Sequence, residues 1–291
     1  MTRSIKWLVM AGLVLALLYW PLTSPLALSP GDLPDHVADP VNGELVFHAG
    51  GCASCHGETL AGGLELQSDF GTFVVPNISP DRATGIGGWS MLQMVNAMML
   101  GTTPGGSHYY PAFPYTSYTR MKVQDVMDLK AYIDTLEPVE HAAGPHELHF
   151  PWNMRRAIGL WKMIYVRQGS VVPLAPADPV IERGRYLVEG AGHCGECHTP
   201  RNLMGGLRIS KWLAGGPNPD GEGRVPNITP HADGLGSWSE SDIAYYLESG
   251  FTPDFDTVGG SMVKVQEHLA LLPESDRKAI SAYLKAVPAL P

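Results

Sequence analysis

The stretch Cys52-Ala53-Ser54-Cys55-His56 stands in the first half of the sequence, and Cys194-Gly195-Glu196-Cys197-His198 repeats its pattern in the second half. Both fit C-x-x-C-H, and together they contain all 4 cysteines of the 291 residues. On the first turn of a helix, cysteines three residues apart lie on one side, where each can form a thioether to a haem vinyl group. The next histidine then reaches the iron. The pattern predicts two haems c, held covalently by Cys52, Cys55, Cys194 and Cys197, with His56 and His198 as axial ligands.

Two other uses of paired cysteines fit the sequence less well. A redox-active dithiol needs no histidine after its second cysteine, and here that histidine occurs twice. A zinc ion shared by both pairs would take its ligands from separate copies of an internal repeat, although each copy has a histidine of its own. We therefore favour the haem interpretation.

The sequence around the two motifs is also repeated, which indicates two similar units. The segment VPNISP at 75–80, for example, returns as VPNITP at 225–230. The other matching pairs are 42–47 with 183–188, 85–90 with 234–239, and 128–133 with 279–284. We place the first unit at 29–138, the second at 179–291, and a connecting strap at 139–178.

The local patterns predict an all-α protein. Ser90 with Gln93, and Ser239 with Asp242, have the spacing of a helix N-cap with a capping box. The segments after these caps carry apolar residues at helical spacing, and no stretch shows sustained period-two alternation. The strap contains an aromatic stretch, 150–165, which indicates an ordered connection rather than a flexible linker.

The N-terminus carries a targeting signal. Two basic residues precede an uncharged run from Trp7 to Leu28, whose strongly apolar part is shorter than the roughly 20 residues that cross a bilayer. A signal sequence cleaved after Ala27 would have Pro25 at position −3, which is unfavourable, and cleavage after Ser29 is disfavoured by the proline that follows. We favour an uncleaved transmembrane helix within 1–28, with its basic end cytoplasmic. Either alternative exports the rest of the chain.

Charge restricts the partners. The formal net charge is −9, so the chain has no basic stripe to neutralise phosphates, and nucleic acid is a poor partner. An acidic surface gains nothing from anionic lipid, so we expect any membrane attachment to be hydrophobic. The sequence contains neither a paired acid and base pattern of carboxylates nor a nucleotide-binding glycine loop.

Each iron needs a sixth ligand, usually methionine or histidine. In the second unit we predict Met262, which follows Gly259-Gly260-Ser261 between the middle and closing helices. Alignment of the closing helices puts Pro111-Ala112-Phe113 opposite Met262, so the first unit has no methionine there. We predict Met121 as its distal ligand, with His108 as the alternative. His48 and His193 flank the cysteines, where a hydrogen bond near the haem and a structural role are both open.

Taken together, these residues resemble the cytochrome c subunits of membrane-bound periplasmic dehydrogenases for alcohols, gluconate, sorbitol and related substrates. The resemblance runs from about residue 42 to 288, and it is most specific at 193–202, 110–115 and the two VPNI segments. Many such subunits have three haem sites, whereas this chain has two. The resemblance implies two tandem class I cytochrome c domains, haem attachment in the periplasm, and electron passage from a dehydrogenase toward quinone or an oxidase.

We therefore expect a membrane-anchored electron-transfer subunit rather than an enzyme, with its haem domains on the periplasmic side. Its partners would be a periplasmic dehydrogenase subunit and an acceptor of the respiratory chain. One alternative is a di-haem peroxidase or thiosulfate-oxidising enzyme, which would need an open or displaceable distal site, and the ambiguity between Met121 and His108 is its support. The other alternative is an electron donor or subunit of a terminal oxidase, which needs the same acidic di-haem body.

Overall fold

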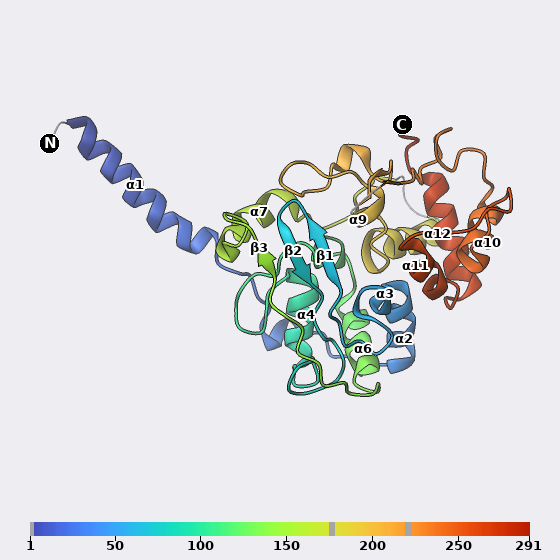
Figure 1. Cartoon of the computed structure of the whole chain (residues 1–291), viewed down its shortest axis with the longest axis horizontal. Helices are drawn as coiled ribbons and strands as arrows, with labels where there is room; N and C mark the ends of the chain where they lie inside the picture. The colour runs from blue at the N-terminus through green and yellow to red at the C-terminus, as the bar shows by residue number, and fades with distance from the viewer. Residues whose placement is uncertain (1–2, 175–177, 219–222) are drawn as a thin grey trace.

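The helix α1 (Arg3–Leu22) projects from a body that holds the other described residues (Figure 1). The computed structural model describes residues 3–174, 178–218 and 223–291. The mean hydropathy of Ile5–Leu22 is 1.8, and this window is 0% buried in the body. By length and composition the helix is therefore a candidate membrane span. Pro21 lies in its last turn, one residue before the helix ends.

The first unit is built on two crossing helices, α2 (Pro40–Ala49) and α6 (Val123–Ile133). Asp39 caps α2 by accepting a hydrogen bond from the Val41 amide, and Pro40 occupies the first helical position. A Cβ on Gly43 would overlap the carbonyl oxygen of Asp128, so only glycine permits this crossing. The other helices are η1 (Pro30–Asp32), α3 (Cys52–His56), α4 (Met91–Leu100) and α5 (Tyr115–Tyr118).

The second unit repeats this arrangement. Helix α8 (Pro179–Arg185) crosses α12 (Glu274–Ala286), and here Gly184 meets the carbonyl oxygen of Ala279 in the same way. A π-helical turn, η3 (Tyr186–Ala191), continues α8 toward the second motif. The other helices are α9 (Gly195–His198), η4 (Ile209–Lys211), α10 (Glu240–Ser249) and α11 (Met262–Leu269).

Both predicted capping boxes are confirmed. At α4 the Ser90 hydroxyl accepts from the Gln93 amide at 3.2 Å, while the Ser90 amide donates to the Gln93 side chain at 2.8 Å. At α10 the Ser239 amide donates to the Asp242 carboxylate at 2.7 Å, and the Ser239 hydroxyl accepts from the Asp242 amide at 3.1 Å.

Short strands correct the expectation of a wholly helical chain. In the first unit β1 (Glu65–Ser68), β2 (Gly71–Val74) and β3 (Glu147–Leu148) form an antiparallel sheet in that order. In the second, β4 (Gly216–Pro217) pairs with β5 (Arg224–Val225). These strands are too short to show the alternation that identifies a strand in a sequence. The body nevertheless remains mostly helical.

The strap between the units crosses the first unit and is fastened to it. The Asn77 side chain donates to the carbonyl of Val139 at 2.7 Å, and His146 accepts from the Val74 amide at 3.1 Å. Farther along, η2 (Arg155–Ala157) leads into α7 (Ile158–Tyr165), which lies beside the foot of α1 (Figure 1). Buried apolar residues of both units join in one core cluster, which contains Phe47 and Met121 from the first unit and Val188 and Tyr283 from the second.

Candidate haem-binding sites

In the first motif, α3 begins at Cys52 directly after Gly51, whose backbone is left-handed with φ 54°. His56 ends this helix, and its Nδ1 lies 2.7 Å from the carbonyl oxygen of Pro76. A carbonyl oxygen only accepts, so Nδ1 carries the proton, and Nε2 of the neutral ring keeps the lone pair that binds iron. Burial lowers the pKa of His56 to about 4, which keeps the ring neutral at physiological pH.

The second motif has the same geometry. His198 ends α9, and its Nδ1 lies 2.9 Å from the carbonyl oxygen of Pro226. Burial lowers the pKa of His198 as well. In both histidines Nε2 thus keeps a lone pair for a metal ion. Both cysteines of the first motif lie within α3, while in the second motif Cys194 is the N-cap of α9 and Cys197 lies within it. This donor set fits a covalently attached haem in each motif.

The surroundings of the thiols bear on one alternative. Burial raises the pKa of Cys52 and of Cys194 to about 12. A redox dithiol reacts through a thiolate of lowered pKa, so these surroundings do not favour dithiol chemistry. Within the described part of the chain, no three side chains of His, Cys, Asp or Glu gather as a site for a metal ion.

The carbonyl groups of Pro76 and Pro226 are site groups that the sequence analysis missed, although the repeated VPNI segments pointed to them. The asparagine that follows each proline holds the loop in shape. Asn77 accepts from the Ser79 amide at 2.8 Å, and Asn227 accepts from the Thr229 amide at the same distance. The repeated segment therefore orients the histidine of each motif.

The segments that directly precede the two C-x-x-C-H motifs lie against each other. The ring Nε2 of His193, just before Cys194, lies 3.1 Å from the carbonyl oxygen of Gly50. A Cβ on Gly50 would lie 3.5 Å from the Ala191 carbonyl oxygen, and one on Gly192 would lie 3.3 Å from that of Ala49. Small residues on both sides thus let the two backbones approach closely. His193 has a structural role in this contact, since it links the units.

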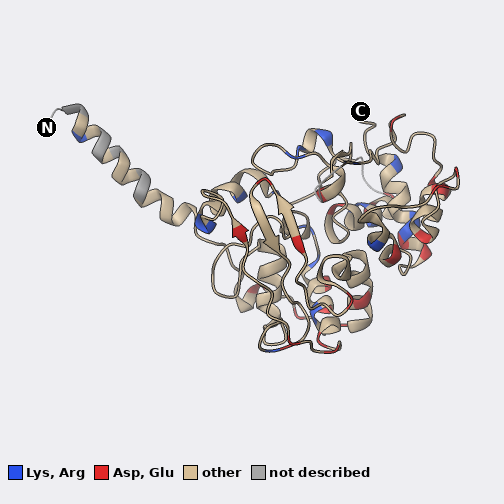
Figure 2. Ribbon diagram, in the orientation of Figure 1, with Lys and Arg blue, Asp and Glu red and all other residues tan. Residues whose placement is uncertain are grey.

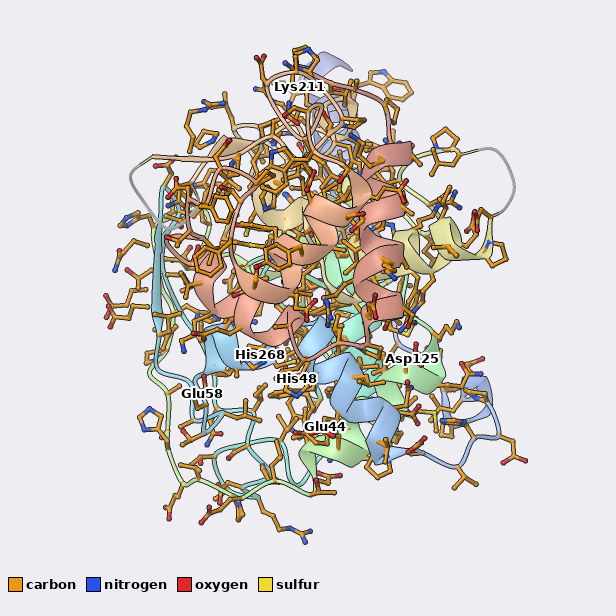
Figure 3. All side chains as sticks on the ribbon, turned by 90° about the vertical axis from the view of Figure 1, so that its right-hand side faces the viewer. Glu44, His48, Glu58, Asp125, Lys211 and His268 are labelled. Atoms are coloured by element: carbon orange, nitrogen blue, oxygen red, sulfur yellow. The ribbon has the colours of Figure 1, made fainter. Side chains whose placement is uncertain are left out.

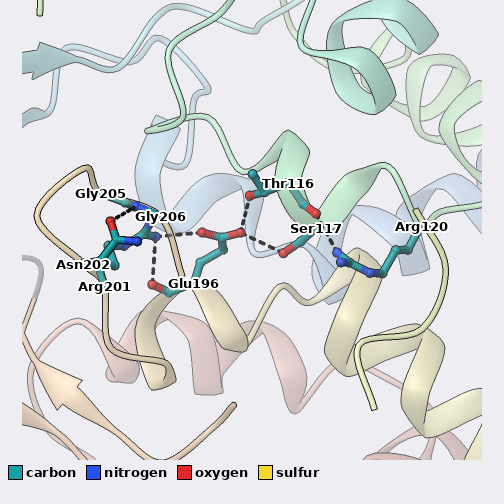
Figure 4. A network of polar contacts seen from close by, with 8 residues as sticks. All are labelled: Thr116, Ser117, Arg120, Glu196, Arg201, Asn202, Gly205 and Gly206. Atoms are coloured by element: carbon teal, nitrogen blue, oxygen red, sulfur yellow. Dashed lines mark hydrogen bonds and ion pairs between the residues drawn. The ribbon is translucent and has the colours of Figure 1, made fainter. Parts of the chain in front are cut away.

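Glu196, inside the second motif, also reaches the first unit (Figure 4). Its carboxylate accepts hydrogen bonds from Thr116 at 2.5 Å and Ser117 at 2.9 Å, both on α5, and from Arg201 at 2.7 Å. Burial acts to raise the pKa of Glu196, but Arg201 and the two hydroxyls outweigh burial and hold this pKa below its usual value. A buried, ionised carboxylate therefore joins α9 to α5.

The predicted distal residues occupy three different settings. Met121 is buried in the core, in the turn between α5 and α6. Met262 is half-buried as the first residue of α11. His108 is buried under the foot of α1, where its Nε2 lies 2.8 Å from the carbonyl oxygen of Thr23.

A loop closed by a backbone bridge precedes Met262 and has a counterpart in the first unit, which agrees with the alignment of the repeats. The backbone pairs Thr102 with His108 in the first unit and Phe251 with Thr257 in the second. Counting five residues on from each second partner places Phe113 opposite Met262. Phe113 packs its ring against Tyr118, with centroids 5.7 Å apart, so an aromatic side chain takes the place of the second unit's methionine.

Comparison with known proteins agrees with this geometry. The family model for cytochrome c matches residues 40–137. The chain is 52% identical to a diheme c-type cytochrome of Cereibacter sphaeroides, over 96% of this chain and 98% of the relative. It is 37% identical to the fructose dehydrogenase cytochrome subunit of Gluconobacter japonicus, over 85% of this chain and 52% of the relative. It is 36% identical to the gluconate 2-dehydrogenase cytochrome c subunit of Pantoea cypripedii, over 84% of this chain and 58% of the relative.

The chain therefore spans between half and three fifths of the length of these two dehydrogenase subunits. The match to the diheme protein, by contrast, covers nearly the whole of both chains. Together with the two motifs and their oriented histidines, this match assigns two c-type haems as the cofactors. The chain belongs to the cytochrome c family, as a diheme c-type cytochrome.

Proposed function

We propose that this chain is an electron-transfer subunit that accepts electrons from a periplasmic dehydrogenase and passes them to the respiratory chain. The observation that carries the proposal is the close contact of the two attachment segments through His193 and Gly50, which brings the two motifs together within one body. The haem iron supplies the redox chemistry by changing between its ferric and ferrous states. The protein contributes ligands, burial and orientation.

Two tandem class I cytochrome c domains, at 29–138 and 179–291, are the domain organisation that we propose. The glycine crossings of α2 with α6 and of α8 with α12 support it, because each joins the first and last helices of one unit. The strap at 139–178 connects the two domains. The thioether attachment is proposed at Cys52, Cys55, Cys194 and Cys197, and proximal ligation at His56 and His198.

Distal ligation is proposed for Met262 in the second domain and Met121 in the first. The position of His108 supports Met121, because the ring is buried and its Nε2 is engaged by the Thr23 carbonyl, which leaves only Nδ1 without a partner. A thioether ligand raises the reduction potential relative to a second imidazole. Methionine in both domains would therefore favour acceptance of electrons from a dehydrogenase.

Attachment to the membrane is proposed through α1, with the haem domains in the periplasm. The C-terminal end of this helix is hydrogen-bonded to the body. The Arg156 guanidinium donates to the carbonyl oxygen of Trp20 at 2.5 Å and to the hydroxyl of Thr23 at 2.9 Å. The names of the relatives, which include cytochrome subunits of fructose and gluconate dehydrogenases, support a dehydrogenase as the donor.

Co-purification from native membranes tests the proposal. A tagged chain should bring down a dehydrogenase subunit, and addition of that enzyme's substrate should reduce the haems at a rate that removal of the subunit abolishes. The control is the purified chain alone, supplied with peroxide or thiosulfate, which should show no turnover. Turnover by the isolated chain, or recovery of a terminal oxidase without any dehydrogenase, would contradict the assignment.

A further inference from the structure

We propose that α7 is a second membrane contact, whose outward face lies among the lipid headgroups beside the foot of α1. The proposal rests on the proposed anchoring of α1 and adds to it a lipid-facing surface on the body. It commits to a lipid surface as the occupant. Four observations lead to it: the exposed side chains, the buried side chains, the position and the charge of this segment.

The outward face of α7 is apolar and exposed. Leu160, Met163 and Ile164 are 41%, 62% and 61% exposed. Their spacing of three and four residues places them on one side of the helix. Phe150 and Met154, in the approach to α7, are 78% and 47% exposed. Apolar side chains gathered in this way on a short segment mark an interaction surface.

The inward face of α7 is firmly held, so the exposed face is not the result of a loose helix. Trp161 is 8% exposed and donates from Nε1 to the carbonyl oxygen of Met204 at 2.8 Å. The Lys162 ammonium donates to the carbonyl oxygens of Leu100 and Gly101, each at 2.7 Å, and thereby caps the C-terminus of α4. These contacts fix which side of α7 faces outward.

The helix α7 begins against the end of α1. Gly159 packs on Thr23 so closely that a Cβ would come within 2.7 Å of the Thr23 Cα. The Arg156 guanidinium stacks 4.1 Å from the centre of the Trp20 ring. Figure 1 shows α7 at the point where α1 meets the body. If α1 spans the bilayer, its end lies at the membrane surface, and α7 lies at the same level.

The charge of this segment differs from that of the whole chain. Residues 149–177 contain four basic side chains and no acidic one, in a chain of net charge −9. Burial lowers the pKa of Lys162 to about 7, so the constant positive charge comes from Arg155, Arg156 and Arg167. Figure 2 shows basic segments at the foot of α1 and on α7 with the acidic strand β3 beside them, while many acidic segments lie around α2, α10 and α11.

This pattern is the one that an interfacial helix needs. Apolar side chains enter the boundary between headgroups and acyl chains, and arginines attract anionic headgroups. The expectation that an acidic body gains nothing from anionic lipid therefore holds for the average surface but not for this segment. With two contacts, α1 and α7, the orientation of the body relative to the membrane is restrained. With α1 alone, the body could tilt about the end of this helix.

Single-cysteine labelling of the holoprotein tests the inference. The native cysteines are consumed in thioethers, so Met163→Cys provides a unique thiol for an environment-sensitive fluorophore. Leu13→Cys reports on α1, and Phe255→Cys, at a side chain that is 84% exposed in the loop between α10 and α11, is the matched aqueous control. Each full-length variant is reconstituted into phosphatidylcholine vesicles with and without phosphatidylglycerol, and quenching by lipid-borne nitroxide and by aqueous iodide is measured.

We expect nitroxide lipids to quench the labels at 13 and 163 several-fold more than the label at 255, and iodide to show the reverse order. Phosphatidylglycerol should strengthen the lipid signal at 163 only. A label at 163 that responds to iodide alone, while the label at 13 responds to lipid, overturns the α7 inference and leaves the anchor intact. A label at 13 in water overturns both. Shielding of position 163 only after a dehydrogenase is added would identify a protein contact and would also overturn the inference.

Discussion

The Nδ1 atoms of His48 and His268 lie 2.9 Å apart, with the two ring planes inclined by 26° (Figure 3). His48 belongs to α2 of the first unit and His268 to α11 of the second, so this pair is a hydrogen bond between the units. One Nδ1 donates and the other accepts, which requires at least one neutral ring. Phe47 packs edge-on against both rings.

Acid should weaken this link. Burial, followed by the neighbouring His268, lowers the pKa of His48, against the opposing charges of Glu44 and Glu58. Below the ordinary histidine pKa of about 6.5, His48 is protonated in the unfolded chain, whereas in the folded chain it stays neutral down to a lower pH. The free energy of unfolding therefore falls as the pH falls. A His48→Gln variant should lose less stability than the native chain on acidification, as measured by denaturant unfolding at neutral and mildly acidic pH.

The control for this experiment is His141→Gln, at an exposed position of the strap. That variant should lose as much stability on acidification as the native chain does. If the His48 variant and the native chain respond to acid alike, the histidine pair does not contribute to the pH dependence.

Replacement of Cys194 and Cys197 by alanine should lower the haem content from two to one per chain. The reason is that a haem c is retained under denaturing conditions only by its thioether bonds. The mass of the denatured protein and its haem stain measure the outcome. The reciprocal variant, with Cys52 and Cys55 replaced, should also retain one haem. A mass that corresponds to two haems in either variant would contradict the assignment of the attachment cysteines.

The two C-x-x-C-H motifs, and with them the two haems c, could be recognised in the sequence because haem attachment requires a fixed local spacing. Cys52, Cys55 and His56 are neighbours on one helical turn, and the capping box of Ser90 with Gln93 is equally local. The contacts between the units were not predictable in this way. Glu196 meets Ser117 across 79 residues, and His193 meets Gly50 across 143. Such pairs depend on how helices pack against one another after they have formed. The spacing of residues in a single sequence does not indicate which distant residues will meet.

Removal of the Glu196 carboxylate should destabilise the body. Glu196→Ala leaves Arg201 without its partner and Thr116 and Ser117 without their acceptor, and breaking a largely buried pair of this kind costs about 3 kcal/mol. Glu196→Gln keeps an acceptor oxygen and should cost less. Denaturant unfolding measures both values. Glu274→Ala is the control, because this exposed residue pairs with the exposed Lys278 within α12 and its loss should cost less than that of Glu196. Equal losses for the Glu274 and Glu196 alanine variants would count against the network.

Met121→Ala should change the first haem alone. If Met121 is the distal ligand, one of two methionine–iron charge-transfer signals disappears from the optical spectrum, and the signal of the second domain stays. The matched control is Met127→Ala, another buried methionine, which lies within α6. A spectrum of the native protein with bis-histidine features, or two unchanged signals in the Met121 variant, would reject this ligand. His108→Ala would then be the decisive variant.

The glycines at the two helix crossings give the last test, which addresses the proposed pair of domains. Ala fits a helix better than Gly by about 1 kcal/mol, so by propensity alone Gly43→Ala and Gly184→Ala should stabilise. Their added methyl groups, however, would overlap the carbonyl oxygens of Asp128 and Ala279. Forcing the crossing helices apart costs about 1–3 kcal/mol or more, so the net effect should be destabilising.

The control is Gly31→Ala, because a Cβ at this position in η1 has no heavy atom within 4 Å. It should change the free energy of unfolding by less than about 0.5 kcal/mol, as expected for a surface substitution. Denaturant unfolding followed at the haem absorption of each domain separates the effects. Gly43→Ala should lower the midpoint of the first domain more than that of the second, and Gly184→Ala should do the reverse. If neither variant is less stable than the Gly31 variant, the two crossings are not the close contacts on which the proposed domains depend.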